Sequence, residues 1–260
     1  MFQAENVRIK LGHSSVVQDA SFTAKAGEVT AIVGPNGSGK TSLLRALTGE
    51  VVYSGRIALD GTDLARMKPM ELAVRRAVLP QSVRLAFPFT VFEVVQLGLS
   101  MGHYGGRDDL VAAALARVGL SEFAGRYYFE LSGGEQQRAQ LARVLVQVWE
   151  PIAQNVACWL FLDEPVASLD IGHQLEVMQL MRDYADAGGG VVAVMHDLNL
   201  TAMFADSVAI LNRGRVMQQG SPETVFNDAI LSDAYGCAIR VSVAPQTGSP
   251  FVLPHPVLNV

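Results

Sequence analysis

Apolar and polar residues alternate along the first third of the chain, with the period of two that is typical of half-buried strands. The clearest stretches are Val7–Leu11 and Val16–Phe22, and an apolar run over Glu28–Val33 ends in a glycine. Two shorter stretches follow at Arg56–Leu59 and Ala77–Leu79. We therefore predict an N-terminal region of short strands joined by turns.

Helical spacing of apolar residues interrupts these strands. One helix is predicted to begin at Lys40 and to end near Gly49. A helical insertion is then predicted over residues 82–135. Within it, Thr90 and the glutamate three residues later have the spacing of a capping box, and a further helix covers Asp108–Gly119.

Strands and helices alternate through the second half of the chain. We predict helices over 133–148 and 172–185, and strands over 159–162 and 191–195. This alternation indicates an α/β fold with a mostly parallel sheet between helices. A hairpin over 208–219 and a short helix from Ser221 are expected next, and then a Pro-rich, short-stranded tail after Tyr235.

The composition is that of a globular protein without a general nucleic-acid function. Half of the 260 residues are apolar, 17% are charged and the net charge is -5. The nearest approach to a basic cluster is Arg75-Arg76, which we interpret as a solvated helix end. Cys158 and Cys237 lack metal-type spacing and are expected to be buried free thiols in a reducing compartment. With no signal-peptide pattern and no apolar run of roughly 20 residues, a cytosolic location is expected.

A glycine-rich segment between a predicted strand and a predicted helix matches the pattern G-x-x-x-x-G-K-[ST]. Glycines let successive backbone N–H groups face a phosphate, and the helix start adds the positive end of its dipole. Lys40 would bind the β- and γ-phosphates and the Thr41 hydroxyl would hold Mg²⁺. The candidate nucleotide-binding residues are Gly34, Pro35, Asn36, Gly37, Ser38, Gly39, Lys40, Thr41 and Ser42.

Two acids end the apolar strand that begins at Trp159. In doubly wound sheets ligands bind at this end of the strands. We predict that Asp163 holds Mg²⁺ and that Glu164 polarises the attacking water.

A second helix start carries glycines. Ser132 and Glu135 have capping-box spacing, and Gly133 and Gly134 would expose backbone N–H groups to another anion.

Taken together, these segments resemble the ATP-binding cassette (ABC) family, in the family's own order over residues 34–196. Gly34–Thr41 is similar to its Walker A loop, Leu160–Glu164 to its Walker B strand and Leu131–Arg138 to its signature. Gln81 is similar to the family's Q-loop glutamine, Ser168-Leu169-Asp170 to its D-loop and His196 to its switch histidine.

The resemblance implies a P-loop ABC ATPase core over 1–81 and 136–236, with an N-terminal antiparallel β region. A helical subdomain over 82–135 and a C-terminal extension over 237–260 complete the chain. Two copies would pack head to tail, with ATP between Lys40 of one and Ser132–Glu135 of the other. Asp170 would join this nucleotide site. Gln81 would sense Mg²⁺ and nucleotide as a catalytic and metal-binding residue, and His196 would contact the γ-phosphate as a catalytic residue.

One departure from the family concerns adenine. The aromatic residue that usually stacks on the base falls at Ile9 by register, and His13 is the alternative. The base contact is therefore lost or supplied elsewhere.

The branch of the family is indicated by Leu85–Val95, which includes Ala-Phe-Pro-Phe and resembles haem-import ATPases. This implies a subunit on the cytoplasmic face of the bacterial inner membrane, bound to dimeric permease subunits and indirectly to a periplasmic haem-binding protein. Phe87, Phe89 and Phe92 would form an apolar socket for the permease or belong to the lobe's own core. Ferric-siderophore or cobalamin import, a non-transport ABC ATPase and a module that binds ATP without turnover remain alternatives.

Overall fold

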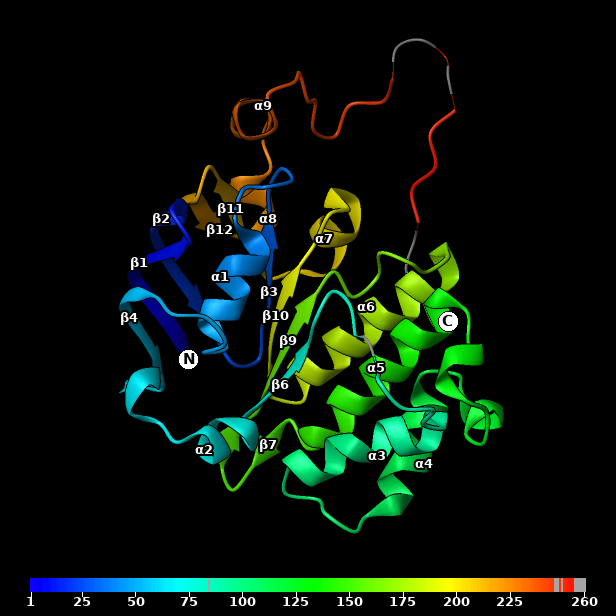
Figure 1. The fold of residues 1–260 in the computed structure, drawn as a ribbon. Coiled ribbons are helices and arrows are strands. Elements are labelled where there is room, and N and C mark those ends of the chain that lie inside the picture. Colours follow the sequence, from blue (N-terminus) through cyan, green and yellow to red (C-terminus); the bar gives the residue numbers. More distant parts are fainter. Residues whose placement is uncertain (84, 246–247, 249, 255–260) are drawn as a thin grey trace.

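One ten-stranded sheet runs through the molecule, which a computed structural model describes over residues 1–83, 85–245, 248 and 250–254 (Figure 1). Its strands, in spatial order, are β5 (Thr62–Asp63), β4 (Ser54–Leu59), β1 (Phe2–Leu11), β2 (Ser14–Ala24), β12 (Arg215–Gly220), β11 (Ser207–Asn212), β3 (Val29–Val33), β10 (Gly190–Val194), β9 (Trp159–Asp163) and β6 (Arg76–Leu79).

The sheet has an antiparallel part and a parallel part. β1 pairs antiparallel with both β2 and β4, whereas β11, β3, β10, β9 and β6 run parallel to one another. The predicted fold class is confirmed, including its N-terminal antiparallel β region. The carboxyl ends of β3 and β9 lie at the same edge of the parallel part, where ligands bind in such sheets.

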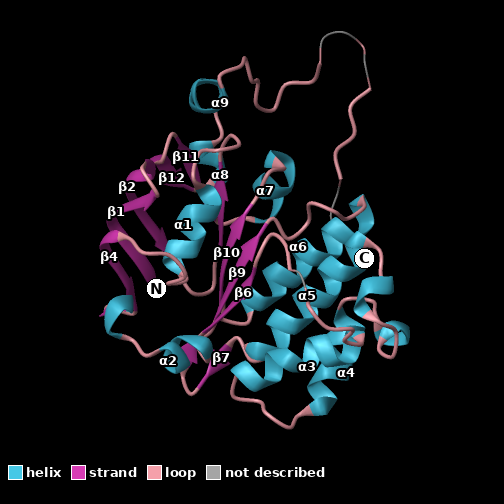
Figure 2. Ribbon diagram, in the orientation of Figure 1, coloured by secondary structure: helices cyan, strands magenta, loops and turns pink. Residues whose placement is uncertain are grey.

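The parallel part separates two hydrophobic cores, because successive side chains of a strand point to opposite faces. In β3, Val29, Ala31 and Val33 belong to one core and Ile32 to the other. Figure 2 shows helices on both faces of these strands. The helix α1 (Lys40–Leu47) contributes Leu43, Leu44 and Leu47 to the second core, which also contains the antiparallel strands.

The first core extends into the predicted helical insertion, which contains α3 (Val91–Met101) and α4 (Asp108–Arg117), and along α5 (Gly133–Gln147), which begins at its end. Both predicted capping boxes are present, Thr90 with Glu93 and Ser132 with Glu135. A Cβ added at Gly98 would lie 2.1 Å from the backbone oxygen of Arg143, so α3 and α5 pack at backbone contact. The subdomain limits at 82 and 135 stay a prediction.

The remaining α-helices are α2 (Pro69–Ala73), which precedes β6, and four in the second half of the chain. These four are α6 (Ile171–Asp186), α7 (Leu198–Phe204), α8 (Pro222–Val225) and α9 (Asp228–Tyr235). No helix in the described part of the chain is both long and apolar enough to cross a membrane.

Four local predictions are wrong. Arg75-Arg76 is no solvated helix end: Arg76 opens β6, and both arginines are half-buried. The segment Glu150–Cys158, which we expect from the sequence to be a surface loop, contains a small hairpin of β7 (Ile152–Ala153) and β8 (Val156–Ala157). The described residues after Tyr235 contain no strand, and residues 246–247, 249 and 255–260 of the predicted extension lie outside the described residues. Cys158 is buried as expected, but Cys237 is exposed.

Candidate active site

The loop between β3 and α1 has a backbone path that only glycine allows. Gly34 adopts a φ of 148°, and a Cβ there would lie 2.0 Å from the backbone oxygen of Leu211. Gly39 adopts a φ of 104°, and its Cβ would lie 2.9 Å from the backbone oxygen of Val16. The loop is therefore held against two neighbouring strands while it turns into the start of α1.

Lys40 begins α1 and directs its ammonium group back over the loop. Its Nζ donates hydrogen bonds to the backbone oxygens of Gly34, at 2.9 Å, and Pro35, at 3.1 Å. Lys40 is 6% exposed and forms no salt bridge with a described carboxylate. Burial lowers the pKa of Lys40, while the nearby Glu164 and Asp163 oppose that shift. A buried cation without an ion-pair partner is suited to an anionic ligand.

The neighbouring Thr41 contacts the acid at the end of β9. Its Oγ1 donates to Asp163 Oδ1 at 3.1 Å. Asp163 is 3% exposed, and burial raises the pKa of its carboxyl, as does Glu164, while the bond from Thr41 lowers it. A hydroxyl and a carboxylate in contact at the edge of a phosphate loop are the oxygen ligands that Mg²⁺ takes in nucleotide sites.

Glu164 and His196 lie against each other beside this pair. His196 follows β10, the neighbour of β9 in the sheet, and its Nε2 is 2.6 Å from Glu164 Oε1. Gln137 lies in α5, and its side-chain amide donates a hydrogen bond to the backbone oxygen of Glu164 at 3.1 Å. This bond holds the turn that follows β9 in place. The contact made by Gln137 was missed by the sequence analysis, although the residue lies inside the signature.

Lys40, Thr41, Glu164 and His196 line one cleft of about 510 Å³, and the buried Asp163 contacts it through Thr41. Gln81, which follows β6, is exposed at its edge, and the aliphatic Val16 of β2 closes another side. The sequence predicts Val16 only as an apolar residue of a strand, so nothing in the sequence marks it as a site residue. The residues that line the cleft are Val16, Asn36, Gly37, Gly39, Lys40, Thr41, Ser42, Gln81, Glu164 and His196.

The remaining predicted nucleotide-binding residues lie outside this cleft. Ser132 caps α5 by accepting from the backbone N–H of Glu135, whose carboxylate in turn accepts from the backbone and hydroxyl of Ser132. Ser132 and Gly133 are exposed, and none of Ser132–Glu135 lines the cleft around Lys40. The chain thus presents a phosphate cradle and a separate glycine-containing helix start.

Asp170 caps the next helix, α6. Its Oδ1 accepts from the backbone N–H of His173 at 3.0 Å, and its Oδ2 lies 2.8 Å from His173 Nδ1. The carboxylate is exposed and does not line the cleft. Asp170 would therefore contact only a nucleotide that is bound outside this subunit's own phosphate cradle.

The register that placed the adenine-stacking position at Ile9 is wrong. Ile9 is fully buried in the core of the antiparallel strands and cannot face a ligand. Leu11, the last residue of β1, is 52% exposed and lies next to a turn that contains the exposed His13.

Comparisons with known proteins agree with this arrangement. The sequence model of the ABC transporter family matches residues 17–167. Hemin import ATP-binding protein HmuV of Jannaschia sp. is 61% identical over 98% of this chain and 94% of its own length. HmuV of Roseobacter denitrificans is 60% identical over 97% of both chains.

Among solved structures, a similar one is an ATP-binding cassette in a dimeric, post-hydrolysis state bound to ADP and Pi. It has a TM-score of 0.74 and 26% sequence identity, and the alignment covers 85% of this chain and 99% of that one. Family model, relatives and fold confirm the resemblance that the motifs indicated, and the chain belongs to the ABC transporter family.

Proposed function

We propose that this chain is the ATP-hydrolysing subunit of an importer and that the imported substrate is haem. The observation that carries the ATPase assignment is the meeting of Lys40, the Thr41–Asp163 pair and the Glu164–His196 pair in one cleft. Three separated sequence segments supply these groups, and together they provide phosphate binding, metal ligands and a base.

The chain's own residues supply most of the chemistry. The N–H groups of the loop and the ammonium group of Lys40 hold the phosphates of the nucleotide. In the bound state, phosphate oxygens replace the backbone oxygens of Gly34 and Pro35 as the hydrogen-bond acceptors of Lys40. Glu164 accepts a hydrogen bond from water and orients it toward the γ-phosphate, a role that contributes about 10²–10⁴ in rate. His196 lies within contact of that carboxylate and can reorient to bind the γ-phosphate oxygen.

Mg²⁺ fits the oxygen donors of this cleft. Thr41 and Asp163 would hold it together with Gln81, and phosphate oxygens and waters would complete the shell, since Mg²⁺ rarely relies on protein ligands alone. When bound, it neutralises charge that develops on the phosphates.

The position of the signature supports a head-to-tail dimer. Ser132 and Gly133 are exposed at the start of α5, and no residue of Ser132–Glu135 lines the subunit's own cleft. A second copy would bring its Ser132–Glu135 over Lys40, with Asp170 beside the nucleotide of its twin. Nucleotide would then close the pair, and hydrolysis would release it and move dimeric permease subunits.

Haem as substrate rests on the names of the relatives, because the residues of the cleft select nucleotide and not cargo. The two relatives named above are hemin import proteins that align over nearly their whole length. We accordingly place the chain on the cytoplasmic side of the bacterial inner membrane, bound through the permease and served by a periplasmic haem-binding protein.

The test is reconstitution of the chain with its permease in liposomes. Haem-loaded periplasmic binding protein is expected to stimulate phosphate release, whereas the same protein without haem should stimulate it less. Binding proteins loaded with ferric siderophore or cobalamin are the controls. Stimulation by one of these but not by haem would replace haem with that substrate.

A further inference from the structure

Two aromatic side chains are exposed just before the signature. Tyr127 is 46% exposed and Phe129 is 64% exposed. Their rings are stacked nearly parallel, with an interplanar angle of 10° and centroids 5.5 Å apart. Because Tyr127 covers only one face of the Phe129 ring, the pair presents a flat aromatic surface that suits another planar group.

The segment that carries this pair is fixed to the start of α5. Tyr128, which lies between the two exposed residues, is 7% exposed and belongs to the first core. The side-chain amide of Gln136 donates to the backbone oxygens of Tyr128, at 3.3 Å, and Leu131, at 3.0 Å. Phe129 therefore keeps a fixed position relative to Ser132, from which three residues of chain separate it by at most about 11 Å.

The cleft around Lys40 offers the base of a nucleotide an aliphatic surface. None of the described residues that line the cleft is aromatic, and His13, the alternative expected from the sequence, does not line it. Val16 closes one side, and the half-exposed Leu11 pairs with Ser14, two residues before Val16 in β2. An aliphatic surface of this kind can cover one face of a base and leaves the other face to a second group.

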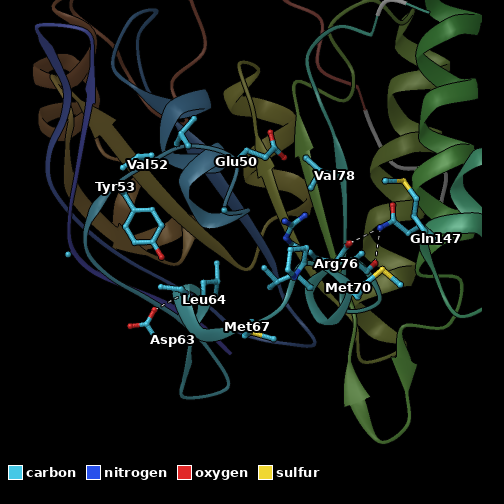
Figure 3. A pocket seen from close by; sticks show the side chains of 18 of the residues that line it. Glu50, Val52, Tyr53, Asp63, Leu64, Met67, Met70, Arg76, Val78 and Gln147 are labelled. Carbon is cyan, nitrogen blue, oxygen red and sulfur yellow. Dashed lines mark hydrogen bonds between the residues drawn. The ribbon is translucent and has the colours of Figure 1, made fainter.

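A separate cavity of about 850 Å³ does not supply that group (Figure 3). It lies between the segment that leads into β4 and the ends of α3 and α5, and it shares no described lining residue with the cleft. Tyr53 is the one aromatic residue among those that line it. Figure 3 shows its ring on the same side of this cavity as Asp63 and Leu64, which also lie outside the cleft.

We infer that Phe129 of one chain stacks on the base of the nucleotide that the second chain of the dimer binds. This inference rests on the proposed head-to-tail dimer, in which Ser132–Glu135 of one chain lies over Lys40 of the other. The signature would then cover the γ-phosphate, whereas the base lies at the far end of the nucleotide. A group that contacts the base must stand away from Ser132 on the same rigid segment, and Phe129 does so.

The base would lie between the aliphatic surface of Leu11 and Val16 of its own chain and the Phe129 ring of the second chain. Tyr127 is a positioning residue in this arrangement, because it packs against the Phe129 ring from behind. The aromatic contact that the sequence placed at the end of the first strand is then supplied by the other subunit. Only the closed dimer would hold the base on both faces.

The test measures closure of the dimer in a Glu164→Gln background, where hydrolysis does not dissolve it. Loss of one base–aromatic stack weakens binding about 5- to 150-fold. Sedimentation with Mg²⁺ and ATP should therefore show, for Phe129→Ala, a dimer dissociation constant raised by this factor for each nucleotide enclosed. Phe129→Trp should close like the parent, and the melting temperature of free Phe129→Ala should not change because the ring is exposed.

Ribose 5-triphosphate separates a base contact from a general interface contact, since it carries the sugar and the phosphates but no base. With this probe, Phe129→Ala and its parent should close equally. A loss as large as the loss with ATP would mean that Phe129 contacts protein and not the base, and it would overturn the inference.

Phe87→Ala is the matched control. Sequence analysis left Phe87, Phe89 and Phe92 as an apolar socket or as part of the lobe's core, and Phe89 and Phe92 pack against that core. Phe87 is 70% exposed and contacts Phe89 edge-on, apart from the stacked pair. Phe87→Ala should close with ATP like the parent, and a loss equal to that of Phe129→Ala would overturn the inference.

Mixed dimers test the direction of the contact. A Lys40→Ala chain supplies only a working signature, and a Ser132→Arg chain supplies only a working cradle. Adding Phe129→Ala to the Lys40→Ala chain should weaken closure of the mixture, whereas adding it to the Ser132→Arg chain should not. The opposite result would place the ring over the cleft of its own chain and overturn the inference.

Two further results are decisive. Equal closure of Phe129→Ala and its parent with ATP would overturn the inference, also where Phe129→Ala lowers only the turnover stimulated by the permease, since the ring would then contact the permease. If the parent itself does not close with Mg²⁺ and ATP, the proposed dimer fails and this inference falls with it.

Discussion

At the scale of single residues, Glu164 combines its proposed chemical role with an unfavourable backbone conformation. Its φ is 55°, a left-handed conformation that costs a non-glycine residue about 1–2 kcal/mol. The hydrogen bonds that its backbone forms with Val194 and Gln137 hold this conformation. As a result, Asp163 is buried against Thr41 while the next side chain turns into the cleft toward His196.

We predict that Glu164→Gln retains ATP binding and loses about 10²–10⁴ in hydrolysis rate, because the amide cannot accept a proton from water. The variant should accumulate as a closed dimer with Mg²⁺ and ATP. Phosphate release and sedimentation measure the two effects. The exposed Glu176→Gln of α6 is the matched control. Normal turnover of Glu164→Gln would remove the base assignment.

At the scale of elements, the β7–β8 hairpin closes with a two-residue turn, since Ala153 pairs with Val156. Gln154 has a φ of 50° and Asn155 a φ of 63°, as in a type I′ turn. Gln is a poor residue for the left-handed region, and Asn-Gly is the pair that this turn favours.

We therefore predict that the double substitution Gln154→Asn, Asn155→Gly raises the free energy of unfolding by about 1 kcal/mol. Urea denaturation should show a higher midpoint with an unchanged slope. Asn155→Ala should shift the midpoint the other way, because alanine tolerates a positive φ less well. A lower midpoint for the Asn-Gly variant would show that the turn has another conformation.

The elements that the sequence predicted well carry two agreeing signals. α3 and α5 each combine helical periodicity with a capping box, and the structure forms both boxes. The β7–β8 strands have two residues each, which is too short for periodicity to register. α9 had local signals, an Asn227 cap and a left-handed Gly236, but its short apolar pattern was not recognised.

Tertiary contacts decide what the sequence could not. Nothing local distinguishes Arg76 as a half-buried strand residue from a solvated one, because its burial comes from packing beside α5. The same holds for Ile9, whose register in β1 turns it into the core. The phosphate loop was predictable because its chemistry is local, whereas the complete cleft brings together residues as far apart in the sequence as Val16 and His196.

At the scale of the whole molecule, Ser132 lies apart from the Lys40 cleft, and the proposed head-to-tail dimer would complete each nucleotide site from two chains. A substitution in the cradle or in the signature should then disable only that half of the nucleotide site and leave the other half of the same chain intact. Lys40→Ala removes the cradle's cation but leaves the signature intact. Ser132→Arg blocks the signature but leaves the cradle of its own chain able to bind ATP.

In a Glu164→Gln background, we predict that neither Lys40→Ala nor Ser132→Arg forms a stable dimer with Mg²⁺ and ATP. A mixture of the two should, because the heterodimer contains one site built from an intact cradle and an intact signature. Differently labelled chains and sedimentation would detect this heterodimer, and Ser132→Thr, which keeps the capping hydroxyl, should dimerise alone. If the Ser132→Arg chain closes as readily as its parent, the signature does not contact the partner's nucleotide, and the head-to-tail arrangement is wrong.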